Sequence, residues 1–157
     1  MTDPQSDSPS DSPSDSQADP TRRSGARRYE GADIAVSYET GICLHAAECV
    51  RGLPEVFDVH RSPWISPDGA PAERVAEVVR RCPSGALQYR LSHGPDERPR
   101  TPTLVARHPD GVLYLRGDLE LELPEGTRRE TRVMLCGCGS TGQPPFCDHS
   151  GRCQPQD

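Results

Sequence analysis

Apolar and aromatic side chains are scarce in this sequence of 157 residues, of which 32% are hydrophobic and 4% aromatic. A chain of this length forms one ordinary domain or two small ones, and small domains with little apolar surface to bury usually need disulfides or metal. No apolar run is long enough for a secretory signal or a membrane span. We therefore expect a cytoplasmic protein without membrane contact, whose cysteines stay reduced and act as ligands.

Excess positive charge is also missing, because the formal net charge is −6. Nucleic-acid binding normally needs a basic surface and aromatic side chains for stacking, so we expect no nucleic-acid partner. The sequence shows no Ser-His-Asp set and no glycine-rich phosphate loop. The composition therefore predicts a binding or carrier protein and not an enzyme.

Cysteine is abundant, and four of the seven cysteines lie between Leu135 and Cys153. These four are Cys136, Cys138, Cys147 and Cys153. Glycines and prolines between the second and third of them favour turns that can fold several sulfurs around one centre. An odd number of cysteines also fits poorly with a disulfide framework. The segment therefore predicts a metal or cluster site.

The same segment resembles the CDGSH iron-sulfur family. The residues in register with its pattern are Cys136, Cys138, Thr141, Pro145, Cys147, Asp148 and Ser150. The resemblance spans about 103–150 and implies a [2Fe-2S] cluster held by three cysteines and one histidine. The family's histidine position is Gly151 here, so the fourth ligand stays open between His149, Cys153 and no fixed ligand. Ligation by Cys153 would lower the reduction potential relative to an imidazole ligand.

A second constellation begins at Cys43 and Cys49, which have the spacing of the outer pair of a ferredoxin C-x2-C-x2-C run with Ala46 in the middle. Cys82, followed by proline, supplies the remote third thiolate. Residues 29–90 resemble the divergent single-cluster 4Fe-4S ferredoxin-like domain, through CLHAAECVRGLPEVF, PWI and CPSGALQY. Three thiolates and an alanine predict a [3Fe-4S] cluster, or a [4Fe-4S] cluster with His45 as its fourth ligand. A role for His45 in a hydrogen bond near the cluster stays equally open.

Hydrophobic periodicity predicts an α+β fold. The domains expected are a disordered Ser/Asp/Pro-rich tail (1–28), a small ferredoxin-like α/β domain (29–91), a linker (92–102) and a β-rich CDGSH-type domain (103–157). Strands are expected at 34–38, 87–91 and 119–123, a helix at 71–81, and a hairpin with its turn at Pro109-Asp110-Gly111.

These patterns predict a two-cluster iron-sulfur protein that exchanges electrons with a redox partner protein. Cluster storage, cluster transfer or redox sensing is the alternative from another functional class. A structural zinc module is the third interpretation, since three cysteines and a histidine also bind zinc. Single CDGSH domains often pair, so a homodimer stays open as well.

Overall fold

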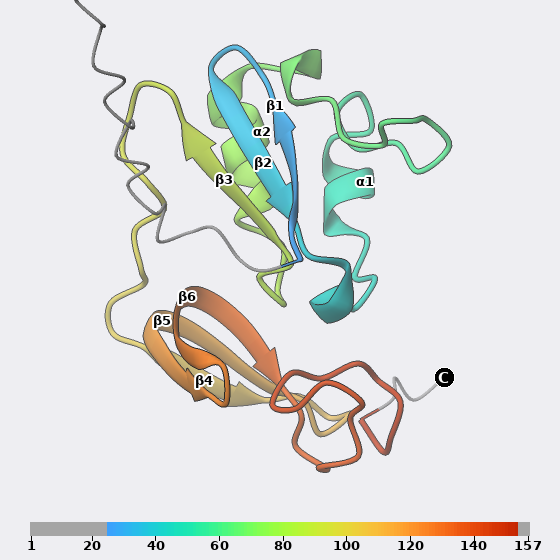
Figure 1. Ribbon diagram of the computed structural model, residues 1–157, viewed down its shortest axis with the longest axis vertical. Coiled ribbons are helices and arrows are strands. Elements are labelled where there is room, and N and C mark those ends of the chain that lie inside the picture. The colour runs from blue at the N-terminus through green and yellow to red at the C-terminus, as the bar shows by residue number, and fades with distance from the viewer. Residues whose placement is uncertain (1–24, 154–157) are drawn as a thin grey trace, which may run out of the picture.

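The computed structural model describes residues 25–153. They form two three-stranded antiparallel sheets with a few short helices (Figure 1), which confirms the expectation of an α+β protein. Most of the predicted tail and the last four residues lie outside the described residues.

The first sheet has the strand order β1-β2-β3. Its strands are β1 (Arg27–Glu30), β2 (Ile34–Tyr38) and β3 (Leu87–Leu91). The alternation of apolar residues correctly predicted β2 and β3. β1 begins at Arg27, within the last two residues of the segment expected to be the tail (1–28), and Arg27 pairs with Tyr38. The charge of Arg27 and Arg28 concealed this edge strand, in which both residues are exposed.

Four helical segments surround this sheet. They are η1 (Thr40–Ile42), α1 (Glu48–Gly52), η2 (Pro67–Gly69) and α2 (Ala72–Val79). The predicted helix at 71–81 corresponds to α2, whose residues Val75, Val78 and Val79 are fully buried. The helix ends at Val79 because the chain turns there, and the N–H of Cys82 reaches back to the Val79 carbonyl at 3.0 Å. This turn delivers the third cysteine of the first constellation.

The second sheet has the strand order β4-β5-β6. Its strands are β4 (Leu104–Arg107), β5 (Leu113–Leu123) and β6 (Gly126–Leu135). The predicted hairpin at Pro109-Asp110-Gly111 joins β4 to β5, with Gly111 in the left-handed region at φ +89°. Residues 119–123 continue the same long strand as 113–116, with a register shift between Arg116 and Leu119.

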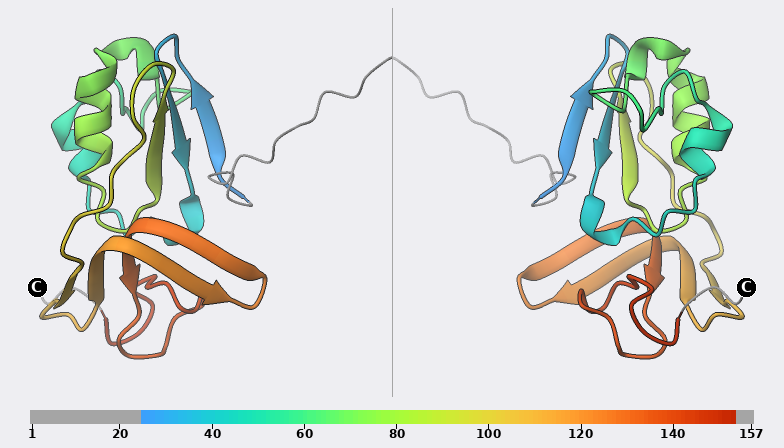
Figure 2. Two further views of the ribbon diagram at one scale, coloured as in Figure 1. Left: turned by 90° about the vertical axis from the view of Figure 1, so that its left-hand side faces the viewer. Right: turned by 90° about the vertical axis from the view of Figure 1, so that its right-hand side faces the viewer.

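The hydrophobic core extends across both sheets. Leu119, Val133 and Phe146 belong to the same buried cluster as the inner face of α2. Figure 2 shows the β5–β6 hairpin lying across one end of the first sheet. The connection at 92–102 contains no helix or strand. The two sequence-defined halves therefore bury apolar surface against one another.

No helix within residues 25–153 is both long enough and apolar enough to cross a membrane.

Candidate metal centres

All seven cysteines are free thiols, and they gather in two groups. In the first group, Cys43, Cys49 and Cys82 line one cavity. Cys43 follows η1, Cys49 lies in α1, and Cys82 follows α2. Three separate helical segments therefore bring the predicted ligands to the same place.

Aromatic side chains enclose the first group. Trp64 lines the same cavity and packs edge-on against Tyr38, with 4.8 Å between ring centroids. Burial raises the pKa of Tyr38 above its ordinary value, and a hydrogen bond with Cys43 adds to the shift. Burial likewise raises the pKa of Cys49, with a contribution from the neighbouring thiols Cys82 and Cys43. Burial at this site therefore disfavours unpaired negative charge on Cys49 and Tyr38.

His45 also lines this cavity, although it is exposed to solvent. Both His45 and Ala47 have positive φ angles, 54° and 61°, although neither is glycine. Such backbone conformations are costly and often mark functional sites. Here they wrap the chain between Cys43 and Cys49 into a tight loop around the cavity. His45 as fourth ligand stays a prediction.

In the second group, the sulfurs of Cys136, Cys138 and Cys153 all lie within 4.8 Å of one another. The Cys136 and Cys138 sulfurs are 3.6 Å apart. The thiol of Cys147 is buried, and this burial raises its pKa to about 11, with contributions from Cys153 and Cys136. Four thiols therefore meet in this loop, which is the number that a [2Fe-2S] cluster needs.

Backbone pairing at the end of β6 holds this loop in place. Cys136 donates its N–H to the Pro145 carbonyl at 2.9 Å, and Cys147 donates to the Met134 carbonyl at 3.1 Å. The carboxylate of Asp148 accepts hydrogen bonds from the side chain and backbone of Ser150 and from the N–H of Gly142, which lower its pKa to about 2. The residues of the CDGSH pattern that carry no sulfur thus fix the shape of the loop.

Three positions bear on the fourth ligand: Gly151, where the family has its histidine, and the two candidates His149 and Cys153. A Cβ atom at Gly151 would lie 2.9 Å from the Cys138 sulfur and 2.5 Å from the Ser140 Cβ, so this position has no room for a side chain. The His149 imidazole is turned toward Asp110, with its Nε2 atom 3.8 Å from an Asp110 carboxylate oxygen. Its backbone N–H donates a hydrogen bond to the Cys147 sulfur, and its buried Nε2 atom has no hydrogen-bond partner among the described residues. Cys153 is buried among the other sulfurs. Cys153 therefore lies closer to the other thiols, while the fourth ligand itself stays a prediction.

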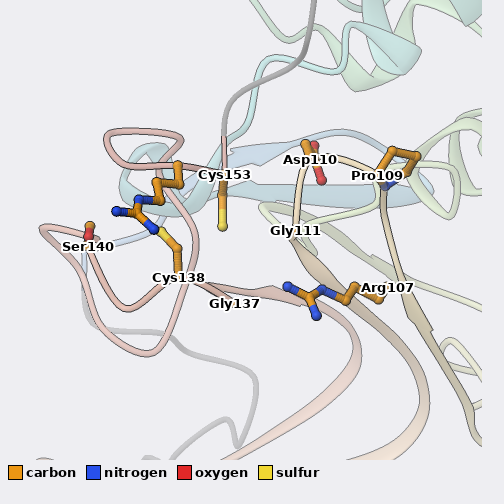
Figure 3. A pocket seen from close by; sticks show the side chains of 9 residues that line it. Arg107, Pro109, Asp110, Gly111, Gly137, Cys138, Ser140 and Cys153 are labelled. Atoms are coloured by element: carbon orange, nitrogen blue, oxygen red, sulfur yellow. The ribbon is translucent and has the colours of Figure 1, made fainter.

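A pocket of about 550 Å³ opens beside this second group. Figure 3 shows the sulfur atoms of Cys138 and Cys153 on one side of it and the side chain of Arg107 on another. The pKa of Cys138 is lowered to about 6, chiefly by the backbone N–H of Ser140 and then by Cys153. These contacts favour the thiolate form of Cys138, which is the form that binds metal.

The loops that carry the two groups touch each other. Leu44, the neighbour of Cys43, packs against the cluster that contains Cys147 and Cys153. A Cβ atom at Gly41 would lie 2.6 Å from the side-chain oxygen of Gln143, which belongs to the second loop. No pattern in the sequence indicated this contact, because the two loops lie about a hundred residues apart along the chain.

A small α+β unit and a small β unit, each presenting clustered thiols, define an iron-sulfur protein with two sites. The comparisons agree in the same order, because "Divergent 4Fe-4S mono-cluster" matches residues 29–92 and "Iron-binding zinc finger CDGSH type" matches residues 110–151. The chain belongs to the divergent 4Fe-4S mono-cluster family and carries a CDGSH-type domain after it.

Two curated relatives are similar to part of the chain. "Uncharacterized protein YjdI" of Escherichia coli strain K12 is 47% identical over 66 residues, which are 42% of this chain and 87% of that protein. The protein of the same name from Escherichia coli O157:H7 matches to the same extent. No solved structure matches the chain.

Proposed function

We propose that this protein carries electrons in the cytoplasm between redox partner proteins, and that it is not an enzyme. The observation that supports this proposal best is that every cysteine belongs to one of two groups, with none left over. The first group, in a ferredoxin-like domain, would hold a [4Fe-4S] or [3Fe-4S] cluster, and the second a [2Fe-2S] cluster. When bound, such clusters supply one-electron redox chemistry.

The surrounding residues suit this task. Trp64 and Tyr38 pack beside the first group and cover part of it, and the hydration of a cluster is one determinant of its potential. The contact of Leu44 with the second loop brings the two sites side by side within one chain. We infer that both sites serve one pathway, in which each partner gains or loses one electron and no covalent bond changes.

For the second site we propose four thiolate ligands, Cys136, Cys138, Cys147 and Cys153. Replacing His149 by alanine should leave the visible spectrum of the C-terminal cluster intact, whereas Cys153→Ala should abolish or strongly alter it. The opposite pattern would assign the role to His149. If the visible spectrum is unchanged in both variants, neither residue is a ligand.

One observation favours a second candidate, the transfer of a cluster to another protein. The pocket beside Cys138 and Cys153 gives an incoming thiol direct access to two of the proposed ligands. Incubation with an apo-ferredoxin acceptor separates the candidates. An electron carrier keeps its iron through many redox cycles, while a cluster donor loses the C-terminal cluster to the acceptor.

The primary test is the content of iron, acid-labile sulfide and zinc in anaerobically purified protein, with electron paramagnetic resonance spectra before and after dithionite. Two clusters require about five or six irons per chain, with sulfide to match. A signal in the oxidised sample would indicate [3Fe-4S] in the first site, and its absence would favour [4Fe-4S] with His45. Zinc without sulfide would refute electron transfer and leave a structural zinc module.

A further inference from the structure

Arg132 is a buried charged residue, with 2% of its surface exposed. It lies on β6 of the C-terminal domain, yet its guanidinium points into the N-terminal one. Three backbone carbonyls there accept its hydrogen bonds: Val79 at 3.0 Å, Cys82 at 2.6 Å and Leu87 at 3.1 Å. One of these carbonyls belongs to a proposed cluster ligand.

The remaining donors of Arg132 bind Glu97 in a bidentate pair. The Nε and Nη2 atoms lie 2.9 Å and 2.8 Å from the two carboxylate oxygens. Nε makes one bond, Nη1 two and Nη2 two, so all five N–H donors of the guanidinium are used. Such full satisfaction is what a buried charge requires, and lysine cannot reproduce the planar fork.

The backbone of Arg132 also contacts the segment that carries Cys82. A Cβ atom at Gly85 would lie 2.5 Å from the Arg132 carbonyl oxygen, so the loop after Cys82 rests directly on β6. Val79 is the last residue of α2, and its carbonyl is one of the groups that a helix end leaves without an internal partner. Arg132 therefore closes the end of α2 and fixes the turn that carries Cys82.

We propose that Arg132 is a positioning residue for the N-terminal cluster site, which holds Cys82 in place from the other domain and sets the electrostatic environment of its thiolate. This inference rests on the proposed function, because it requires a cluster at Cys43, Cys49 and Cys82. A reduced cluster carries more negative charge than an oxidised one, so a nearby cation favours reduction and a nearby carboxylate opposes it. Arg132 and Glu97 should therefore shift the potential in opposite directions.

The test is the midpoint potential of each cluster in the full-length protein, measured by redox titration with electron paramagnetic resonance detection. Arg132→Gln should make the N-terminal potential more negative, and Glu97→Gln should make it more positive. Arg132→Lys keeps the positive charge but loses the planar set of donors. The potential of the N-terminal cluster should therefore stay close to that of the unaltered protein, while its electron paramagnetic resonance signal broadens. The potential of the C-terminal cluster should stay constant and serves as the internal reference.

The matched control is Arg129→Gln on the same strand. The Arg129 side chain is 80% exposed and pairs with Glu120 at 3.3 Å, so solvent screens its charge and neither potential should move. Unchanged potentials in Arg132→Gln and Glu97→Gln, or shifts of the same sign, would overturn the proposal. If Arg132→Gln does not fold, the potentials of Glu97→Gln and Arg132→Lys test the proposal: an unchanged potential in Glu97→Gln, or a shift to more negative values, would overturn it.

The unaltered protein separates this proposal from the proposed function. Iron and sulfide at both sites, together with unmoved potentials in the variants, would refute only the role of Arg132. Absence of sulfide in the unaltered protein would overturn both proposals.

Discussion

Restoring the histidine of the CDGSH pattern should damage the C-terminal site instead of improving it. Gly151 occupies the family's histidine position, and Gly151→His would therefore regenerate the familiar three-cysteine, one-histidine set. The structure predicts the opposite outcome, because any Cβ atom there would lie 2.5 Å from the Ser140 Cβ and 2.9 Å from the Cys138 sulfur. Ordinary contacts between carbon atoms are about 3.5–4.0 Å, so the neighbouring loop must move by roughly 1 Å.

The magnitude follows from the cost of overpacking. Forcing extra atoms into a packed site costs about 1–3 kcal/mol, and each 1.4 kcal/mol corresponds to a factor of about ten in an equilibrium constant. We therefore expect Gly151→His and Gly151→Ala to weaken cluster retention by about 5-fold to 150-fold. The half-life of the C-terminal cluster's visible absorption in the presence of an iron chelator measures this loss.

Gly139→Ala is the matched control. Gly139 lies in the same loop and also lacks a side chain, but no atom lies within 4 Å of where its Cβ would be. Its φ angle of +76° makes alanine cost about 1–2 kcal/mol in backbone energy, so this variant shows the effect of strain without a collision. Full iron and sulfide content in Gly151→His, with nitrogen hyperfine coupling to the cluster, would refute the reasoning and assign the ligand to position 151.

Three further outcomes test the packing. In Gly85→Ala, the new Cβ atom would lie 2.5 Å from the Arg132 carbonyl oxygen at a residue with a positive φ angle, so the free energy of unfolding of the protein in urea should fall by about 3 kcal/mol. An effect no larger than that of exposed Val105→Ala would contradict the docking of this loop. Phe146→Ala removes a buried ring over which the Arg128 guanidinium lies at 4.9 Å and should cost about 3–5 kcal/mol in the same assay, while a cost below 1 kcal/mol would mean that the shared core is absent. Removing iron with a chelator should lower the melting temperature by about 10 °C or more, because metal binding is coupled to folding; an unchanged value in calorimetry would show that the cysteine loops fold without metal.

Local patterns in the sequence were enough to predict much of the first domain. β2, α2 and β3 follow apolar periodicity that tertiary contacts reinforce, and the Pro109-Asp110-Gly111 turn correctly located the β4–β5 hairpin. The cysteine spacings also predicted both groups, since thiolates that share a centre must be brought together by short loops.

The interface between the domains could not be predicted in this way. β6 begins with the polar run Gly126 to Arg132, which resembles a solvated segment until the partner domain is in place. Glu130 and Arg132 in this run are nevertheless buried, and Glu130 accepts a hydrogen bond from Gln88 of the first sheet at 3.0 Å. Two of their partners, Gln88 and Glu97, lie more than thirty residues away along the chain, and no periodic pattern in the sequence predicts such distant contacts.

Spacing alone was also insufficient for the fourth ligand of the second site. His149 lies two residues after Cys147, and only the backbone at φ +58° turns its ring toward Asp110. The close approach of Gly151 to Cys138 is likewise a property of the folded loop.

The shared core makes the two domains poor candidates for exchange as independent modules. If the N-terminal domain of this chain were joined to a CDGSH domain without an arginine at the position of Arg132, the carbonyls of Val79, Cys82 and Leu87 would lose the guanidinium that binds them. Substitutions on β6 and on the Cys82 loop should therefore be inherited together within this domain arrangement. Recombination between such proteins should succeed when the Cys82 loop and β6 both come from the same parent. It should fail when the crossover falls in the connection at 92–102, because the two domains then come from different parents.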